Sequence, residues 1–556
     1  MANVNGSAGE EWVLIHSSPF NGIVRLVSGE IKAIGCVGIS IPSVESPGFS
    51  IGAAGVSVVL LPGERLYLRS YTGIVEVALI PKESNKAFES FQKTAFGELS
   101  VAQPTSITQI TATYGILDTT RPILGPGSSA TTENNVFVAQ SGLHPFGVVS
   151  LHTTRQLSYK AGQGGLVRIT ALFDNSSAGN RCLAGLLTAE NRMGFGYNNN
   201  EFGILLAHDG VAESQTLTIS TAANGIENAT ITVNGTPFTV PITAGSVEHN
   251  AYEIALYLEA NDPLHDFESV MDKVVCTGVL DGPEGAYSFS SATSVAAWSQ
   301  DVEGVYITDE WTPRTQWNRN TCAWLDVTKG NVYQIQFQYL GFGAIRFYVE
   351  SPESGCFVLV HVIEYANKHL APSVSNPSFR IGWASQNLGV GDNVIVRGGS
   401  AAAFVEGDPT QSDDTRGIEV DAENIGTEET TILAIRNPYT FAARINRVEI
   451  SILLMSLGTD TTKRAKFKIR KNPTITGDFI FSEVDPASPV QIATDNNPVS
   501  GGKLMFSFVM TKEGIPPIDL TGKLLLLPRD ILVISSSVSS GSPSEMSASL
   551  NWREDF

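Results

Sequence analysis

Three tryptophans that lie close together in the sequence could bind a sugar. Trp311 and Trp317 enclose the segment Trp311-Thr-Pro-Arg-Thr-Gln-Trp317, and Trp324 follows shortly after it. An indole ring offers a flat apolar face on which a sugar ring can stack. Large aromatic side chains also fill the cores of β-sandwiches, so a purely structural role is the alternative for all three. The cluster is a candidate ligand-binding site for a glycan.

A stripe of basic residues is the second candidate site. In the segment Arg464-Ala-Lys-Phe-Lys-Ile-Arg-Lys471, strand alternation places Arg464, Lys466, Lys468 and Arg470 on one face. This basic stripe could contact another subunit or an anionic ligand such as a phosphorylated glycan. The alternative is cross-strand pairing with acidic neighbours, which suits a chain with a formal net charge of −20.

Motifs of catalysis are absent from the sequence. It has no Gly-x-x-x-x-Gly-Lys-Ser/Thr phosphate loop, no Gly-x-Ser-x-Gly elbow and no His-Glu-x-x-His pair. The pairs Gly194-Phe-Gly196 and Gly341-Phe-Gly343 lack the third glycine of a dinucleotide loop, and we expect them to serve hairpin turns. Two carboxylates of a glycosidase could meet across strands, but the sequence does not place them. We therefore expect no catalytic residue, no cofactor and no enzyme.

Metal-ligating patterns are equally sparse. His361 and His369 lie on either side of a strand end with Cys356 nearby, and structural histidines are the expected reading there. The acidic residues of 406–429 indicate a solvated linker, with a calcium site as the alternative. The sequence thus predicts no metal site.

The elements that must position these residues are strands, and the most regular run of them lies at 331–365. In 331–339, Tyr, Ile and Phe alternate with Val and Gln, so one face is apolar and the other faces water. Leu340-Gly-Phe-Gly343 predicts a turn and 344–350 a second strand. The segment 357–365 is apolar on both faces, which is typical of a central strand. Such a meander needs a second sheet over its apolar face, so the segment predicts a β-sandwich.

The rest of that sandwich is expected earlier in the chain. Residues 193–197 and 201–207 indicate the arms of a hairpin around an Asn-rich tip, and 331–365 would be their partner. We therefore expect a discontinuous β-sandwich formed by 101–212 and 311–405.

The residues between these two segments predict an inserted α+β lobe at 213–310. Asn234-Gly235 is a strong signal for a two-residue hairpin turn. Ser246 is a candidate N-cap, followed by apolar residues at helical spacing from Val247 to Leu258.

Three further segments complete the expected organisation. Residues 1–80 predict an N-terminal β domain and 415–556 a C-terminal β-sandwich. Residues 81–100 predict a helical linker, which either packs on its own domain or forms a neck where subunits meet. The polar segment 405–417 indicates a linker. The fold class is therefore mainly β, with several β-sandwich or jelly-roll-like domains, one small α+β insertion and a short helical linker.

Composition limits the classes of function. Of 556 residues, 17% are charged, and 52 glycines with 27 prolines suit many short strands joined by turns. A net charge of −20 argues against a nucleic-acid binder. No secretory signal and no apolar run long enough to span a membrane are visible, so no membrane insertion is expected. The scattered cysteines indicate unpaired thiols in a reducing cytoplasm, namely Cys36, Cys182, Cys276, Cys322 and Cys356.

Several short motifs resemble a module of virion structural proteins from tailed bacteriophages and other large viruses. The C-terminal part is similar to terminal β-domains of phage fibres and surface proteins, and the resemblance spans about 130–556. The motifs in the module are Trp311-Thr-Pro-x-x-x-Trp-Asn318, Thr328–Gln334, Tyr339–Gly343, Phe347–Glu350 and Ile363–Asn367, with Gly194–Tyr197 and Phe202–Leu205 upstream; those of the C-terminal part are Gly501-Gly502, Ile518–Leu520, Leu525–Pro528 and Asn551–Phe556.

The resemblance implies a lectin-like β-sandwich module in a virus particle that assembles in the host cytoplasm. It implies other virion proteins as partners, a homo-oligomer, most simply a homotrimer, and a host cell-surface glycan as a ligand. For the N-terminal residues it implies virion anchoring. The leading hypothesis is a tail-fibre or baseplate-associated protein that contributes to host attachment. The alternatives are a capsid decoration protein or head fibre, and a virion-borne polysaccharide depolymerase.

Overall fold

The computed structural model of the protein consists of two compact units, Met1–Lys93 and Thr94–Phe556. It describes residues 104–556 except 161, 175–176, 391, 408–414, 443, 477–479 and 513–514. Before residue 104 it describes the backbone of eight strands and the buried side chain of Leu66. The helical linker expected at 81–100 lies outside the described residues, apart from Pro81, which ends a strand. Of the linker expected at 405–417, residues 408–414 lie outside them, whereas 405–406 and 415–417 belong to strands.

The N-terminal unit contains two antiparallel sheets of four strands each, with the orders β1-β8-β3-β6 and β2-β7-β4-β5. The β-rich character predicted for 1–80 is confirmed by these strands. Their bounds are β1 (Ala2–Val4), β2 (Val13–His16), β3 (Phe20–Ser28), β4 (Ala33–Gly38), β5 (Phe49–Ile51), β6 (Val56–Leu60), β7 (Arg65–Ser70) and β8 (Val75–Pro81).

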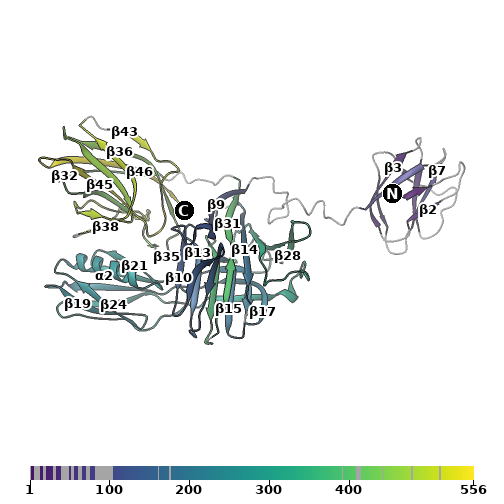
Figure 1. The fold of residues 1–556 in the computed structure, drawn as a ribbon, viewed down its shortest axis with the longest axis horizontal. Coiled ribbons are helices and arrows are strands. Elements are labelled where there is room, and N and C mark those ends of the chain that lie inside the picture. The colour runs from purple at the N-terminus through teal and green to yellow at the C-terminus, as the bar shows by residue number, and fades with distance from the viewer. Residues whose placement is uncertain are drawn as a thin grey trace. The chain divides into compact units, whose positions relative to one another are not determined.

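The second unit is built around a sandwich of two antiparallel sheets (Figure 1). A seven-stranded sheet has the order β10-β13-β29-β15-β16-β17-β25. Its strands are β10 (Thr120–Leu124), β13 (Val148–Thr153), β15 (Asn180–Leu187), β16 (Arg192–Asn198), β17 (Glu201–His208), β25 (Thr308–Pro313) and β29 (Arg380–Asn387).

The facing sheet has the order β11-β12-β30-β14-β26-β27-β28, and β31 pairs with both β14 and β9. Its strands are β9 (Pro104–Thr111), β11 (Ser129–Glu133), β12 (Val136–Gln140), β14 (Gly165–Phe173), β26 (Asn331–Phe337), β27 (Ile345–Glu350), β28 (Phe357–Ile363), β30 (Ile395–Gly398) and β31 (Ser400–Glu406). Single 3₁₀ turns follow β9 and β25, namely η1 (Ala112–Tyr114) and η2 (Arg314–Gln316).

Alternating side chains of both sheets form one apolar core. Tyr333, Ile335 and Phe337 of β26 are buried, as the period-two pattern predicts. Phe195 of β16 packs on Tyr333 and Phe347 with ring centroids 4.7 and 5.6 Å apart. The strands at 193–207 and 331–363 are therefore partners across the core, in opposite sheets, and do not share a sheet.

The prediction of a central strand at 357–365 is wrong, because β28 is the last strand of its sheet. Its outer edge is covered by the segment after η2. Asn318 Nδ2 donates to Val362 O at 2.8 Å, and the Val362 N–H donates to Asn318 Oδ1 at 2.9 Å. The N–H groups of Arg319 and Asn320 both donate to Val360 O. An edge strand can be apolar on both faces when a loop covers its free edge.

The glutamine face of β26 was expected to face water, and this is also wrong. Gln334 and Gln336 are only 3% and 4% exposed. Arg168 Nε donates to Gln334 Oε1 at 3.1 Å, and Gln336 Nε2 donates to Glu406 Oε1 at 2.9 Å. The Tyr348 hydroxyl donates to Gln336 Oε1 at 3.2 Å. Long side chains of the neighbouring strands thus cover the polar face and satisfy its amides.

Gly194 and Gly196 do not serve a turn. They lie inside β16, where Gly194 is opposite Gly185 and Gly196 is opposite Gly203. A Cβ at Gly196 would lie 1.9 Å from Cys182 O, so these glycines permit close backbone approach within the sheet. Gly341 does serve a turn, with a φ of +78°.

The inserted residues form an α+β lobe with sheets of order β21-β22-β18-β24 and β20-β19-β23 and the helix α2 packed on them (Figure 1). Asn234 and Gly235 have φ values of 46° and 79°, which suit the predicted two-residue turn. The Ser246 hydroxyl accepts from the His249 N–H at the start of α2. The elements are β18 (Ser214–Thr221), β19 (Glu227–Val233), β20 (Thr236–Ile242), α2 (Val247–Asn261), β21 (His265–Val270), β22 (Lys273–Gly278), β23 (Ser288–Ser290) and β24 (Val295–Val302).

The C-terminal domain is a second sandwich with its own core, which includes Phe467 and Trp552. One sheet has the order β32-β46-β36-β43, with β44 on β36, and the other β39-β40-β33-β45-β37-β42. The strands of the first sheet are β32 (Thr415–Ile425), β36 (Glu449–Thr459), β43 (Ile515–Asp519), β44 (Leu525–Leu526) and β46 (Ser544–Asp555). Those of the second are β33 (Thr430–Arg436), β37 (Ala465–Lys471), β39 (Ser482–Glu483), β40 (Gln491–Ala493), β42 (Lys503–Met510) and β45 (Ile531–Val538). Two short pairs are β34 (Thr440–Phe441) with β35 (Arg444–Ile445), and β38 (Thr474–Ile475) with β41 (Val499–Ser500).

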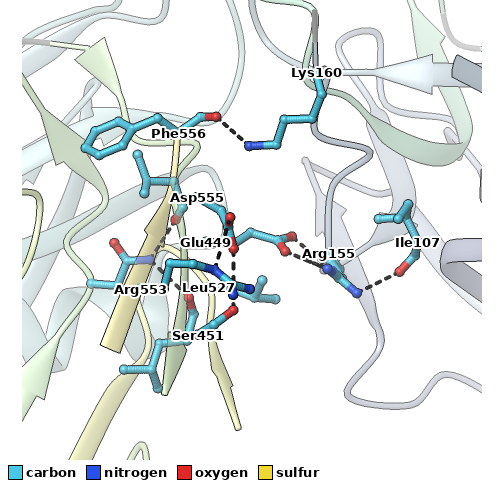
Figure 2. Close-up of polar contacts among 12 residues, drawn as sticks. Ile107, Arg155, Lys160, Glu449, Ser451, Leu527, Arg553, Asp555 and Phe556 are labelled. Carbon is cyan, nitrogen blue, oxygen red and sulfur yellow. Dashed lines mark hydrogen bonds and ion pairs between the residues drawn. The ribbon is translucent and has the colours of Figure 1, made fainter. Parts of the chain in front are cut away.

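Polar contacts attach the C-terminal domain to the central sandwich (Figure 2). Arg155 donates from Nε and Nη2 to the Glu449 carboxylate, at 3.0 and 2.7 Å, and from Nη1 to Ile107 O at 2.9 Å. Lys160 Nζ donates to Phe556 O at 2.7 Å. The end of the chain is therefore part of the contact between the two domains.

Candidate functional site

A cleft of about 700 Å³ lies where the central sandwich, the lobe and the C-terminal domain meet. Its floor is the outer face of the seven-stranded sheet. Residues of the lobe, such as Leu280 and Tyr306, form one wall, and residues of the C-terminal domain, such as Tyr439, form another. The volume is in the range of small-molecule sites in proteins.

Strand alternation explains why this face carries polar and charged groups. In and beside β29, Phe379, Ile381 and Trp383 point into the sandwich core and are fully buried. The residues between them in the sequence therefore point outward, and Arg380 and Ala384 line the cleft.

The middle of the floor is apolar. Leu183, Leu187 and Leu205 form a small hydrophobic cluster on the outer face of the sheet, and Ala384 packs against it. All four residues line the cleft. The floor can therefore take the apolar side of a ligand.

Five arginines line the cleft, and four of them are held by carboxylates. Their ion pairs are Arg121 with Asp266 at 2.5 Å, Arg181 with Asp309 at 2.6 Å, Arg447 with Glu190 at 2.5 Å, and Arg192 with Asp281. Arg380, the fifth, makes no ion pair with any residue that the structure describes, and its buried Nε has no hydrogen-bond acceptor.

Arg380 lies beside two other positive charges. Burial, together with the charges of Arg121 and Arg447, lowers the pKa of Arg380 to about 10. It stays protonated at neutral pH. Burial and the charges of Arg380 and Arg121 lower the pKa of His152 well below its usual value, so the imidazole is neutral. This end of the cleft is cationic and has an unused guanidinium.

The structure does not gather the three candidate tryptophans into one site. Trp311 lies on the outer face of β25 and packs against the leucine cluster of the cleft floor. Trp317 is only 5% exposed and packs in the core on Phe195 and Phe202. Trp324 is 41% exposed. Of the three, Trp324 is the one whose ring is open to a sugar, and that role stays a prediction.

The basic stripe divides into two halves. Lys468 Nζ and Arg470 Nε donate to the Glu429 carboxylate at 2.5 and 2.6 Å. This is pairing with an acidic neighbour, as the alternative supposed, but Glu429 lies just before β33, which is not paired with β37, and so the contact is not between paired strands. Lys466 and Arg464 are exposed at the other end of the stripe. A subunit or anion contact there stays a prediction.

The residues weighed as metal ligands have other contacts. His369 stacks on Tyr365 with ring centroids 3.8 Å apart, and His361 Nδ1 accepts from the Asn318 N–H. Within the described part of the chain, no group of three or more ligating side chains could hold a metal ion. Cys182, Cys276 and Cys322 are buried free thiols, whereas Cys356 is exposed; the side chain of Cys36 lies outside the described residues.

Sequence reasoning missed Arg380 and the cleft. The one local signal is an arginine between buried aromatic residues in Phe379-Arg-Ile-Gly-Trp383, which marks the outer face of a strand. The lobe and the C-terminal domain cover this outer face, and nothing in the local sequence pattern of β29 indicates that they do.

No protein family matches the chain, and no curated protein matches it. Among solved structures, the chain is similar to the carbohydrate recognition domain of Emp47p, with 9% identity and a TM-score of 0.22 over 55% of this chain and 98% of that one. It is also similar to a structure of the triple jelly roll fold and turret assembly in an archaeal virus, with 10% identity and a TM-score of 0.16 over 82% of this chain and 98% of that one. No function is drawn from likenesses this low.

None of the described helices is long and apolar enough to cross a membrane.

Proposed function

We propose that the protein is a structural component of a phage particle, a tail-fibre or baseplate-associated protein that contributes to attachment to the host surface. It acts as a homo-oligomer, as a trimer in a fibre, and it binds a host cell-surface glycan without cleaving it. The N-terminal unit anchors it in the particle.

The observation that supports this proposal best is the cleft on the outer face of the seven-stranded sheet. It combines an apolar floor with charged groups that also line it, which suits the mixed apolar and polar surface of a sugar. Motifs that resemble virion proteins, from Trp311 to Asn367, belong to the same sandwich. Several modest sites per particle suffice for attachment, because binding at several points multiplies their effect.

The proposal is tested in two ways with the purified protein and the particles that carry it. Labelling with an antibody should mark the tail, and the purified protein should bind host cells and compete with particle adsorption. Label spread over the capsid without cell binding would instead support the decoration alternative. New reducing ends released from host polysaccharide would contradict a purely binding role.

A further inference from the structure

We propose that the cationic end of the cleft recognises the acidic group of a saccharide, a carboxylate or a phosphate ester, with Arg380 as its anchor. The inference names the ligand class of the cleft. It rests on the proposed function for the origin of that ligand in the host surface.

The first argument is the unmatched charge. Arg121, Arg181, Arg192 and Arg447 each have a carboxylate partner, whereas Arg380 has none among the described residues. A guanidinium enclosed by protein with an unsatisfied buried nitrogen is unfavourable unless an acceptor is supplied. An anion in the cleft would supply both the acceptor and the opposite charge.

The second argument is that the protein around Arg380 makes this charge less favourable. Arg121 and Arg447 are close enough to lower the pKa of Arg380, and Asp266, a carboxylate whose charge acts on Arg380, is already bound to Arg121 and Arg529. If Arg380 served only the stability of the fold, a third cation beside Arg121 and Arg447 would be unfavourable there. The arrangement suits a site that is completed by a ligand.

The third argument is the match between donors and an oxyanion. The planar guanidinium of arginine can bind both oxygens of a carboxylate or phosphate through parallel hydrogen bonds. Tyr439 lines the cleft near Arg380, and burial together with Asp266 raises the pKa of its hydroxyl, so the hydroxyl keeps its proton and is a donor. His152 is neutral and adds no competing charge.

The remainder of the cleft suits a sugar attached to that acidic group. The apolar floor, where the partly exposed Ala384 packs on the buried leucine cluster, suits the apolar face of a pyranose ring. Tyr306 and Phe146 line the cleft and are each 69% exposed, so their rings are available at its mouth for stacking.

The test is calorimetric titration of the full chain at low ionic strength with glucuronate, glucose 6-phosphate and glucose. We expect one or both acidic sugars to bind about ten-fold or more tightly than glucose, since a charge-assisted pair is formed only with them. Preference for glucuronate identifies a carboxylated glycan, and preference for glucose 6-phosphate a phosphorylated one.

Arg380→Gln gives the matched variant, and Lys329→Gln, which removes an exposed charge outside the cleft, gives the control. Arg380→Gln should reduce the affinity for the acidic sugar to that for glucose, whereas Lys329→Gln should not change it. Without ligand, Arg380→Gln should unfold at the same temperature as the wild type or higher, because it removes an unpaired buried charge.

Equal affinity of the wild type for all three sugars would overturn the inference. This comparison uses the wild type alone, so it does not depend on whether a variant folds. Full binding by Arg380→Gln would overturn the role of that residue. If the protein binds host cells and acidic sugars do not compete with that binding, the acidic ligand is refuted while the attachment role stands. Acidic-sugar binding without any cell binding would refute the attachment role alone.

Discussion

Glu429 is the carboxylate that fixes half of the basic stripe. It accepts from Arg470, Lys468 and the Ser535 hydroxyl. Burial alone would raise the pKa of Glu429, but the hydrogen bonds from Arg470 and Lys468 outweigh burial and lower it to about 2. The ionised form is thus favoured in the folded domain.

The consequence is a loss of stability in acid. Because the pKa of Glu429 is lower in the folded domain than the unfolded value of 4.5, its contribution to the free energy of unfolding is complete at pH values above 4.5. This contribution is lost as the pH falls towards 2. Glu429→Gln should reduce the free energy of unfolding by about 1–3 kcal/mol at neutral pH and flatten this acid dependence. Urea unfolding between pH 7 and pH 2 measures both. The exposed Glu419→Gln is the control, and an equal effect there would contradict the assignment.

For His265 we expect the opposite pH dependence of stability, with a loss at alkaline pH. Burial lowers its pKa, but contacts with Asp262 at 2.8 Å and Glu284 at 3.1 Å raise it to about 9. Its contribution to stability is therefore complete below the unfolded value of 6.5 and is lost as the pH rises through 9.

Thermal unfolding should show the lobe less stable at pH 9.5 than at pH 6, and His265→Gln should remove most of that difference. His144→Gln, which changes an exposed imidazole, should preserve it. A lobe equally stable at both pH values in the wild type would refute a protonated His265.

At the scale of elements, the side-chain amide of Asn318 takes the hydrogen bonds that a neighbouring strand would make at the edge of β28. Its amide makes two hydrogen bonds to the backbone of Val362. Asn318→Ala should lower the free energy of unfolding of the sandwich by about 1–3 kcal/mol, because both backbone groups lose their partner. Chemical denaturation measures the change, and the exposed Asn228→Ala in the lobe serves as a control. No loss of stability would mean that water replaces the amide there.

Local alternation and turn chemistry were sufficient to predict several of the elements. The meander predicted at 331–365 is confirmed as three strands between Asn331 and Ile363, and the Asn234-Gly235 hairpin and the Ser246-capped helix are confirmed as well. Neighbours in space were not predictable in the same way. Gln334 and Gln336 are buried by side chains from distant strands, and β28 is an edge strand whose edge is covered by a loop. Both depend on tertiary contacts that the period of one segment does not contain.

At the scale of the whole second unit, arginine–carboxylate contacts join the domains that surround the cleft. Arg155 binds Glu449 across the contact between the sandwich and the C-terminal domain, and Arg121 and Arg529 both bind Asp266 of the lobe. These contacts depend on residues far apart in the sequence, which is why neither Arg380 nor the cleft could be predicted from local patterns.

A double-mutant cycle tests the link between the sandwich and the C-terminal domain. Arg155→Ala and Glu449→Ala should show a coupling of about 1–2 kcal/mol in denaturant unfolding, reduced by the partial exposure of Arg155. Coupling near zero would show that the contact in Figure 2 adds nothing to domain attachment.

The most direct test of the account is an experimental structure of the full chain with an acidic oligosaccharide from the host surface. We predict density for the saccharide on the outer face of the seven-stranded sheet, with its acidic group against Arg380 and a sugar ring over the apolar floor. An empty cleft with the saccharide bound at Trp324 or along the basic stripe would contradict the account.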